Sequence, residues 1–95
     1  MNYTVSLTQI DNMKHCIGFR EDRVRGRKNR RYEAFRNYFT TSDDHPGWDR
    51  LVEQGLAEKR PFPSGGGPNP QVYYVTLAGM EYLSRITGVL ITEGD

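Results

Sequence analysis

Apolar side chains recur at helical spacing in several parts of the chain. Near the N-terminus five of them follow one another at intervals of two to four residues: Val5, Leu7, Ile10, Met13 and Ile17. This spacing predicts an amphipathic helix over residues 8–17, capped by Thr8 or Ser6. Gly18 follows directly and is expected to end the helix.

The next two segments differ sharply in composition. Residues 19–31 are rich in arginine, contain Gly26 and show almost no apolar periodicity, so we expect a loop. Aromatic residues then return, mostly at spacings of three and four: Tyr32, Phe35, Tyr38 and Phe39. Together with Ala34 they predict a second helix over about residues 30–39, with its aromatic stripe facing the core.

A third helix is predicted after a polar turn over residues 40–47. Asp44 or His45 can cap it, and Pro46 suits its first turn because proline lacks the N–H that would be unpaired there. The helix spans residues 48–54, with Trp48, Leu51 and Val52 on its buried side.

The remainder of the chain predicts a β-hairpin and a last helix. Residues 56–60 and 71–75 are expected to be strands, and the glycine- and proline-rich segment 61–70 between them can join neither a strand ladder nor a helix. Thr76 is expected to cap a fourth helix, which Gly88 ends. A short apolar tail follows: Val89, Leu90 and Ile91.

Two runs in the second half carry a family resemblance. They are Leu51-Val52-Glu53-Gln54-Gly55-Leu56-Ala57 and Tyr74-Val75-Thr76-Leu77-Ala78-Gly79, followed by Leu83. Over about half of the chain, the sequence resembles winged-helix regulators such as the MarR-like and PadR-like families. In this pattern Gly55 provides a left-handed cap, and Gly79 permits close packing of the last helix against the hairpin.

The resemblance implies an α+β, mainly helical fold of the winged helix-turn-helix type, with three helices, a two-stranded β-hairpin wing at about residues 56–75 and a closing C-terminal helix. With 95 residues, the whole chain is expected to be one such domain. The N-terminal half, from Thr8-Gln9-Ile10 to Phe35-Arg36-Asn37-Tyr38-Phe39, also resembles small phage and prophage proteins without an assigned activity.

Composition narrows the possible location. The single cysteine, Cys16, cannot form an internal disulfide, which fits a reducing cytoplasm. The first residues, Met1 to Ser6, lack a charged leader followed by a long apolar run. No window approaches the roughly 20 apolar residues needed to cross a bilayer, so we expect no membrane contact.

Charge is concentrated although the chain carries only +1 overall. Residues 20–36 contain eight cations against three acids. Arginine forks match phosphate geometry, so this segment is a candidate for contact with a nucleic-acid backbone. The alternative is a solvated loop whose arginines pair with Asp43, Asp44 or Glu93.

In a winged helix, residues 48–54 would form the recognition helix. Its outward residues would be Asp49, Arg50, Glu53 and Gln54, and two acids there weaken the case for reading DNA. The glycine-rich tip of the wing could follow phosphates or serve only as a connection. The candidate nucleic-acid-binding residues are therefore Arg23, Arg25, Arg27, Lys28, Arg30, Arg31, Arg50, Gln54, Lys59 and Arg60.

Other chemistry is not expected. His15, His45 and Cys16 are too few and too badly spaced for a metal site, and no residue has a recognisable nucleophile or acid–base setting. We therefore expect no enzyme activity, metal or cofactor. Three aromatic residues are expected to be free for partner contact: Tyr3, Phe62 and Tyr73. The expected partner is double-stranded DNA; the alternative is a protein-interaction adaptor that binds a protein or itself through the apolar tail.

Overall fold

A computed structural model describes residues 3–94, which contain three α-helices and five strands. The helical elements are α1 (Leu7–Cys16), the 3-10 helix η1 (Glu21–Arg23), α2 (Pro46–Glu53) and α3 (Leu77–Thr87). The strands are β1 (Arg31–Ala34), β2 (Phe39–Thr41), β3 (Ala57–Pro61), β4 (Gln71–Val75) and β5 (Leu90–Glu93). The first two residues of the N-terminal segment, where no leader is expected, lie outside the described residues.

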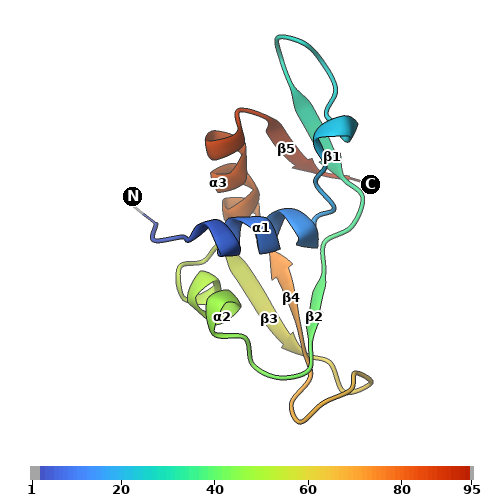
Figure 1. Ribbon diagram of the computed structural model, residues 1–95, viewed down its shortest axis with the longest axis vertical. Coiled ribbons are helices and arrows are strands. Elements are labelled where there is room, and N and C mark those ends of the chain that lie inside the picture. Colours follow the sequence, from blue (N-terminus) through green and yellow to red (C-terminus); the bar gives the residue numbers. More distant parts are fainter. Residues whose placement is uncertain (1–2, 95) are drawn as a thin grey trace.

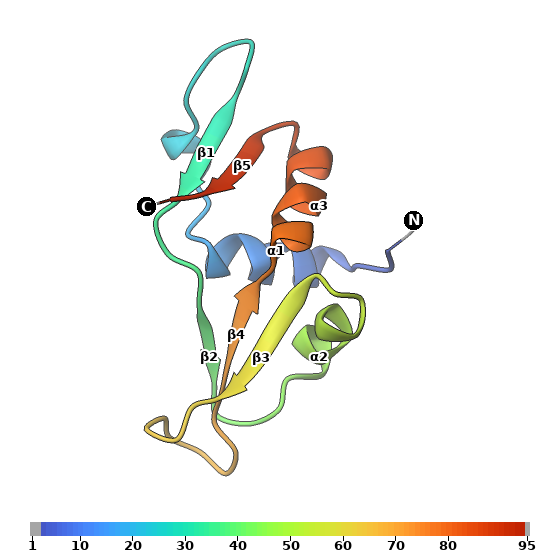
Figure 2. The same cartoon turned by 180° about the vertical axis from the view of Figure 1, so that it is seen from behind.

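The strands form two separate sheets, and α1 crosses the middle of the molecule between them (Figure 1). One sheet is antiparallel in the order β2–β4–β3, with Phe39 and Lys59 both opposite Tyr73. The other is a parallel pair of β1 and β5, in which Tyr32 is opposite Ile91. Figure 2 shows α3 beside β5 and α2 beside β3, so each sheet has a helical neighbour.

The core joins all three helices to both sheets. Its largest fully buried side chains include Met13 of α1, Trp48 of α2, Tyr73 of β4 and Leu83 of α3. Trp48 is stacked on Tyr73, with their ring centroids 5.4 Å apart, and lies 5.3 Å from the ring of Phe39. These three aromatic rings therefore connect α2 to the three-stranded sheet.

The predicted caps of three helices are confirmed. Ser6 caps α1 in a capping box with Gln9, and the His45 side chain accepts a hydrogen bond from the Trp48 N–H at the start of α2. The Thr76 hydroxyl accepts from the Gly79 N–H, and Gly88 ends α3 in the left-handed conformation. These residues lie within a few positions of the helix end that they determine, and the ends could therefore be predicted from the sequence.

The predicted helix over residues 30–39 is wrong. In its place lie β1 and β2, joined by a short connection. Along β1, Tyr32 and Ala34 are buried while Arg31 and Glu33 are exposed, which is the alternation of a strand. Tyr32 pairs with Ile91 of β5, which is far away in the sequence. The stability that this strand pairing provides exceeds the helical preference that the spacing of the aromatic side chains suggested.

The mainly helical winged helix-turn-helix fold is therefore also wrong. The chain is a mixed α+β protein with 35% helix and 24% strand, arranged in one parallel and one antiparallel sheet. A helix-turn-helix needs a helix directly before α2, and that position is occupied by β2. The predicted two-stranded wing is instead part of a sheet that β2 completes on the free side of β4.

The apolar tail is part of the fold. Val89 and Ile91 are buried, and residues 90–93 form β5 against β1. Leu90 alone of the three tail residues is exposed. Most of the apolar surface that suggested a partner-binding tail is thus used inside the molecule.

Cys16 is buried, and we expect it to be unreactive in the native state. The side chain is fully buried on α1, and burial raises the pKa of its thiol to about 12. Because the thiolate is the reactive form, we expect no measurable reaction with a chromogenic disulfide reagent in mildly alkaline solution. The same assay in strong denaturant should show one reactive thiol at once. Rapid reaction of the folded protein would contradict the placement of Cys16 in the core.

Candidate nucleic-acid interface

The arginine-rich segment forms a loop that projects from one end of the molecule (Figure 1) and is closed by a single antiparallel bridge. Arg25 and Arg31 exchange two backbone hydrogen bonds, each 2.9 Å long. Gly26 starts the turn with a φ of +89°, and a Cβ at this position would lie 2.5 Å from the carbonyl oxygen of Asn29. We call residues 20–31 the arginine arm. The expected loop is correct for its tip, but its base is ordered by this pairing.

The arm holds most of the molecule's positive charge. It contains seven cations and two acids, whereas the other 83 residues contain six cations and ten acids. Both acids of the arm are already paired, Asp22 with Arg20 at 3.3 Å and Glu21 with Arg30 at 2.5 Å. Among the described residues, five cations of the arm have no carboxylate within 4.0 Å: Arg23, Arg25, Arg27, Lys28 and Arg31.

The alternative pairing expected for these arginines is not found within residues 3–94. Asp44 binds Lys59, and the Asp43 carboxylate accepts a hydrogen bond from the backbone N–H of Asp44. No cation of the arm lies within 4.0 Å of Asp43, Asp44 or Glu93 in the part of the chain that is described. Its free positive charge therefore faces solvent.

Three of the unpaired arginines line one cavity. Arg25 and Arg31 are directly opposite each other in the bridge, so their side chains share a face, and like charges in that arrangement repel. With Arg23 and Phe35 they border a cavity of about 470 Å³. Asp22 and Glu33 also border it. An anion in this cavity would relieve the repulsion between the guanidinium groups.

Tyr32 anchors the base of the arm to the body of the protein. Its hydroxyl donates to the carbonyl oxygens of Ile17 and Gly18, at 2.9 and 2.7 Å. Burial raises the pKa of the Tyr32 hydroxyl, which keeps it protonated as a donor. The ring of Phe19 packs edge-on against Tyr32 with centroids 5.2 Å apart. The arm thus starts from a fixed position.

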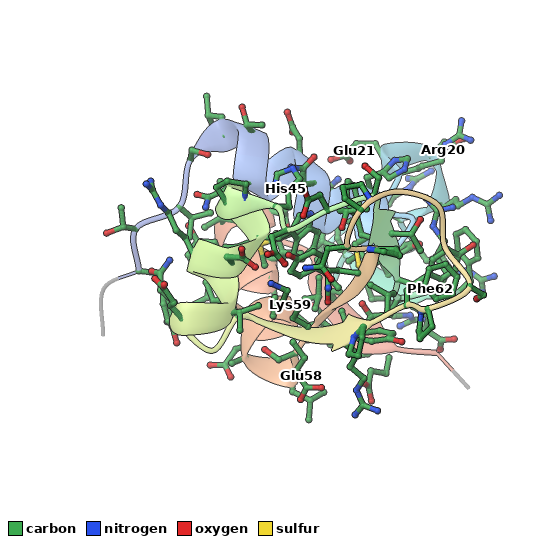
Figure 3. The ribbon with its side chains drawn as sticks, turned by 90° about the horizontal axis from the view of Figure 1, so that it is seen from below. Arg20, Glu21, His45, Glu58, Lys59 and Phe62 are labelled. Carbon is green, nitrogen blue, oxygen red and sulfur yellow. The ribbon has the colours of Figure 1, made fainter. Side chains whose placement is uncertain are left out.

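Of the candidate residues outside the arm, Lys59 is engaged in ion pairs, whereas Arg50 and Arg60 are exposed. Lys59 binds Asp44 at 2.6 Å and Asp49 at 3.1 Å. The hydrogen bond from Lys59 to Asp44, strengthened by that to Asp49, raises the pKa of Lys59. Figure 3 shows Lys59 on the side of β3 that faces α2, with Glu58 on the other side. Arg60 is exposed, and its nearest carboxylate is that of Glu58 at 4.0 Å.

The outward face expected for α2 is only partly correct. Asp49 lies toward the sheet and accepts a hydrogen bond of 2.8 Å from the hydroxyl of Tyr73. Although burial opposes ionisation, hydrogen bonds from Tyr73 and Lys59 hold the pKa of Asp49 below its usual value. Gln54 exchanges hydrogen bonds with the backbone of Thr4, so its amide fixes the N-terminal segment.

The three aromatic residues expected to be exposed behave differently. Tyr73 is fully buried, and burial raises the pKa of its hydroxyl. Tyr3 packs edge-on against Tyr82, with ring centroids 5.5 Å apart. Phe62 is half-buried and lies against Gly65, where a Cβ would be 2.6 Å from its ring.

The structure therefore divides the predicted site residues into two groups. The six in the arm lie together at one end of the 46 Å long axis, whereas the loop between β3 and β4 lies at the other end (Figure 1). Lys59, Arg60, Arg50 and Gln54 belong to the β3 and α2 region, away from the arm (Figure 1). They do not form one surface with it.

Two aromatic residues beside the arm were assigned to the core by the sequence and are exposed. Phe35 is 62% exposed and Tyr38 is 53% exposed. Arg36 lies between them, with its guanidinium carbon 5.7 Å from the ring centroid of Phe35 and 6.0 Å from that of Tyr38. The alternation of β1 could have found Phe35, because a strand with Tyr32 and Ala34 inward places residue 35 outward.

Further features bear on the class of site. Among residues 3–94, no group of three or more His, Cys, Asp or Glu side chains could hold a metal ion. No helix in this described part is long and apolar enough to span a membrane. Comparisons with family models, with curated proteins and with solved structures found no match. Function is accordingly inferred from the residues of this chain alone.

Proposed function

We propose that the protein is a non-catalytic binding protein that contacts the phosphate backbone of nucleic acid through the arginine arm. The observation that carries the proposal is the group of Arg23, Arg25 and Arg31 around one cavity, with no carboxylate paired to them among the described residues. Repulsion between neighbouring guanidinium groups is tolerable when a polyanion neutralises it. A cytoplasmic location, where nucleic acid is accessible and a free thiol such as Cys16 stays reduced, is part of this proposal.

Charge separation supports a defined orientation on the polyanion. The arm carries a surplus of five positive charges, whereas the rest of the chain carries a surplus of four negative charges. The phosphate backbone attracts the arm and repels the rest of the chain, so the molecule should approach it with the arm. Arginine also binds phosphate oxygens in a two-pronged geometry that lysine cannot match.

Binding should depend steeply on salt. For about four phosphate contacts, affinity should fall roughly 50-fold for a single strand and roughly 150-fold for a duplex between about 50 mM and about 200 mM salt, because each contact releases condensed counterions. Fluorescence anisotropy with labelled oligonucleotides measures this. Changing Arg25, Arg27, Lys28 and Arg31 together to glutamine should weaken binding at the lower salt concentration at least about tenfold and flatten the salt dependence.

The matched control removes four cations elsewhere: Lys14, Arg50, Arg60 and Arg85, each changed to glutamine. It has the same net charge as the arm variant and should retain most of the affinity. Glu33→Gln removes a carboxylate from the cavity and should tighten binding several-fold. The proposal fails if no oligonucleotide binds at low salt, or if the control variant loses as much affinity as the arm variant.

A protein-interaction adaptor is the alternative function. Leu90 on β5 favours this function, because this apolar residue of the tail is 60% exposed. An adaptor of this kind would form a stable oligomer or complex that is insensitive to changes in the arm. Sedimentation of a monomer whose binding to nucleic acid weakens with salt would exclude it.

A further inference from the structure

Phe35 and Tyr38 project into solvent at the base of the arginine arm, in the connection between β1 and β2. An exposed aromatic residue is unremarkable by itself. These two, however, alternate with arginines: the guanidinium carbon of Arg23 is 5.2 Å from the ring centroid of Phe35, and Arg36 contacts both rings. The result is a row of four planar groups, which we call the stacking row: Arg23, Phe35, Arg36 and Tyr38.

The stacking row is held in place by the body of the protein. Arg36 donates a hydrogen bond of 2.7 Å to the carbonyl oxygen of His15, and the Tyr38 N–H donates to the carbonyl oxygen of Cys16. Between them, the Asn37 side chain both donates to and accepts from the backbone of Val75, each at 2.8 Å. A ligand that stacks here therefore meets side chains whose backbone is already ordered.

Gly18 makes room for the Phe35 ring. A Cβ at this position would lie 2.4 Å from Cε1 of Phe35, closer than any real contact of that kind. The ring thus lies directly over the glycine that ends α1, while 62% of the residue stays exposed. The edge of the ring is thus packed against Gly18, and most of the residue remains exposed beside Arg23 and Arg36.

Two members of the stacking row, Arg23 and Phe35, border the cavity that the arginines of the arm line. Phe35 borders the same 470 Å³ space as Arg23, Arg25 and Arg31. Phosphate and base are neighbours in every nucleotide, so a strand with its backbone on the arginines would bring bases to the row. Aromatic side chains and arginine planes both stack on bases, and this contact tolerates any sequence.

We propose that the preferred ligand is single-stranded nucleic acid, with unpaired bases stacked on Phe35 and Tyr38. This inference rests on the proposed function, because it assigns the ligand class of the same arm. In a duplex the faces of the bases are covered by their neighbours, so the row has nothing to stack on. A single strand offers both phosphates and open base faces. DNA and RNA share this chemistry and are compared in the test.

Anisotropy with four probes of one length, roughly 16 nucleotides, separates these contributions. The probes are single-stranded DNA, single-stranded RNA, a DNA duplex of the same sequence, and a single strand with abasic sites in place of most bases. We expect the better of the two single strands to bind at least tenfold more tightly than the duplex. The abasic strand keeps every phosphate and should bind several-fold more weakly than its parent.

Phe35→Leu and Tyr38→Leu keep the apolar bulk and remove the aromatic faces. Each should weaken single-strand binding about fivefold or more and leave duplex binding and the salt dependence unchanged. In the double variant, the abasic and parent strands should bind equally. Phe62→Leu is the matched control, because Phe62 lies in the β3–β4 loop, at the end of the molecule opposite the arm (Figure 1), and its loss should have no effect.

The outcomes separate this inference from the proposed function. Equal salt-sensitive binding of duplex, abasic and normal strands, unchanged by Phe35→Leu, would overturn the stacking row and leave the arginine arm intact. Absence of binding to every probe would overturn both. Because the abasic comparison uses the unaltered protein, the inference stays testable even if a substitution at Phe35 disturbs the packing on Gly18.

Discussion

Replacing Trp48 with alanine is expected to lower the free energy of unfolding by about 3–5 kcal/mol. Trp48 is fully buried, and its ring joins α2 to β2 and β4 through contacts with Phe39 and Tyr73. Alanine would leave a cavity that those two rings cannot close without losing their own contacts. Because domains of this size have a total stability of about 5–15 kcal/mol, the variant should be near the limit of folding.

Urea denaturation followed by far-ultraviolet circular dichroism measures this change, since the only tryptophan of the chain is removed. Trp48→Phe is the graded control. The indole N–H of Trp48 is buried and makes no hydrogen bond among the described residues, so phenylalanine gives up ring volume but no polar contact. Its cost should be about 1–2 kcal/mol. Equal stabilities of the alanine variant and the parent protein would show that the ring is not the link between α2 and the sheet.

Changing Gly79 to alanine should destabilise the protein by about 1–3 kcal/mol, although the same change in an exposed helix would stabilise it by about 1 kcal/mol. Gly79 lies in the first turn of α3. A Cβ there would be 2.3 Å from the carbonyl oxygen of Leu56 and 2.7 Å from Cγ1 of Val75. The first neighbour is backbone, so relief requires α3 to move away from the β-hairpin.

The sign of the effect is the test, measured by thermal or urea unfolding. Gly66→Ala, in the β3–β4 loop, is the matched substitution: a Cβ there has no heavy atom within 4 Å. That control should change stability by less than about 0.5 kcal/mol. A stabilised Gly79→Ala variant would mean that α3 does not pack against Leu56 and Val75 at this distance.

Much of the secondary structure was predictable because its signals are local. The caps at Ser6, His45 and Thr76 follow from residue types within a few positions of the feature. Strands β3 and β4 were also predictable, from their residue types and the glycine-rich loop between them. Because β3 and β4 follow each other in the sequence, their antiparallel pairing could be expected from the order of the elements.

The candidate site was only partly predictable. The charge of the arginine arm is a property of composition, and it was located correctly. Whether Lys59 and Asp49 face solvent or each other depends on how α2 lies on β3, which no local pattern encodes. They pair in the folded protein, which removes Lys59 from the candidate binding residues and Asp49 from the expected outward face of α2.

What the sequence alone determined is the set of helix ends, the hairpin strands and the concentrated positive charge, all of which depend on neighbouring residues. Only the tertiary structure determined that residues 30–39 contribute to strands and not to a helix. The three- and four-residue spacing of their aromatic side chains is compatible with a helix. The strand is nevertheless more stable, because β1 pairs with β5 and the Tyr32 hydroxyl donates hydrogen bonds to backbone carbonyls at the end of α1. That choice turns Phe35 outward beside the arm. Pairing between strands that are distant in the sequence depends on the packing energy of the whole fold, which no local sequence pattern encodes.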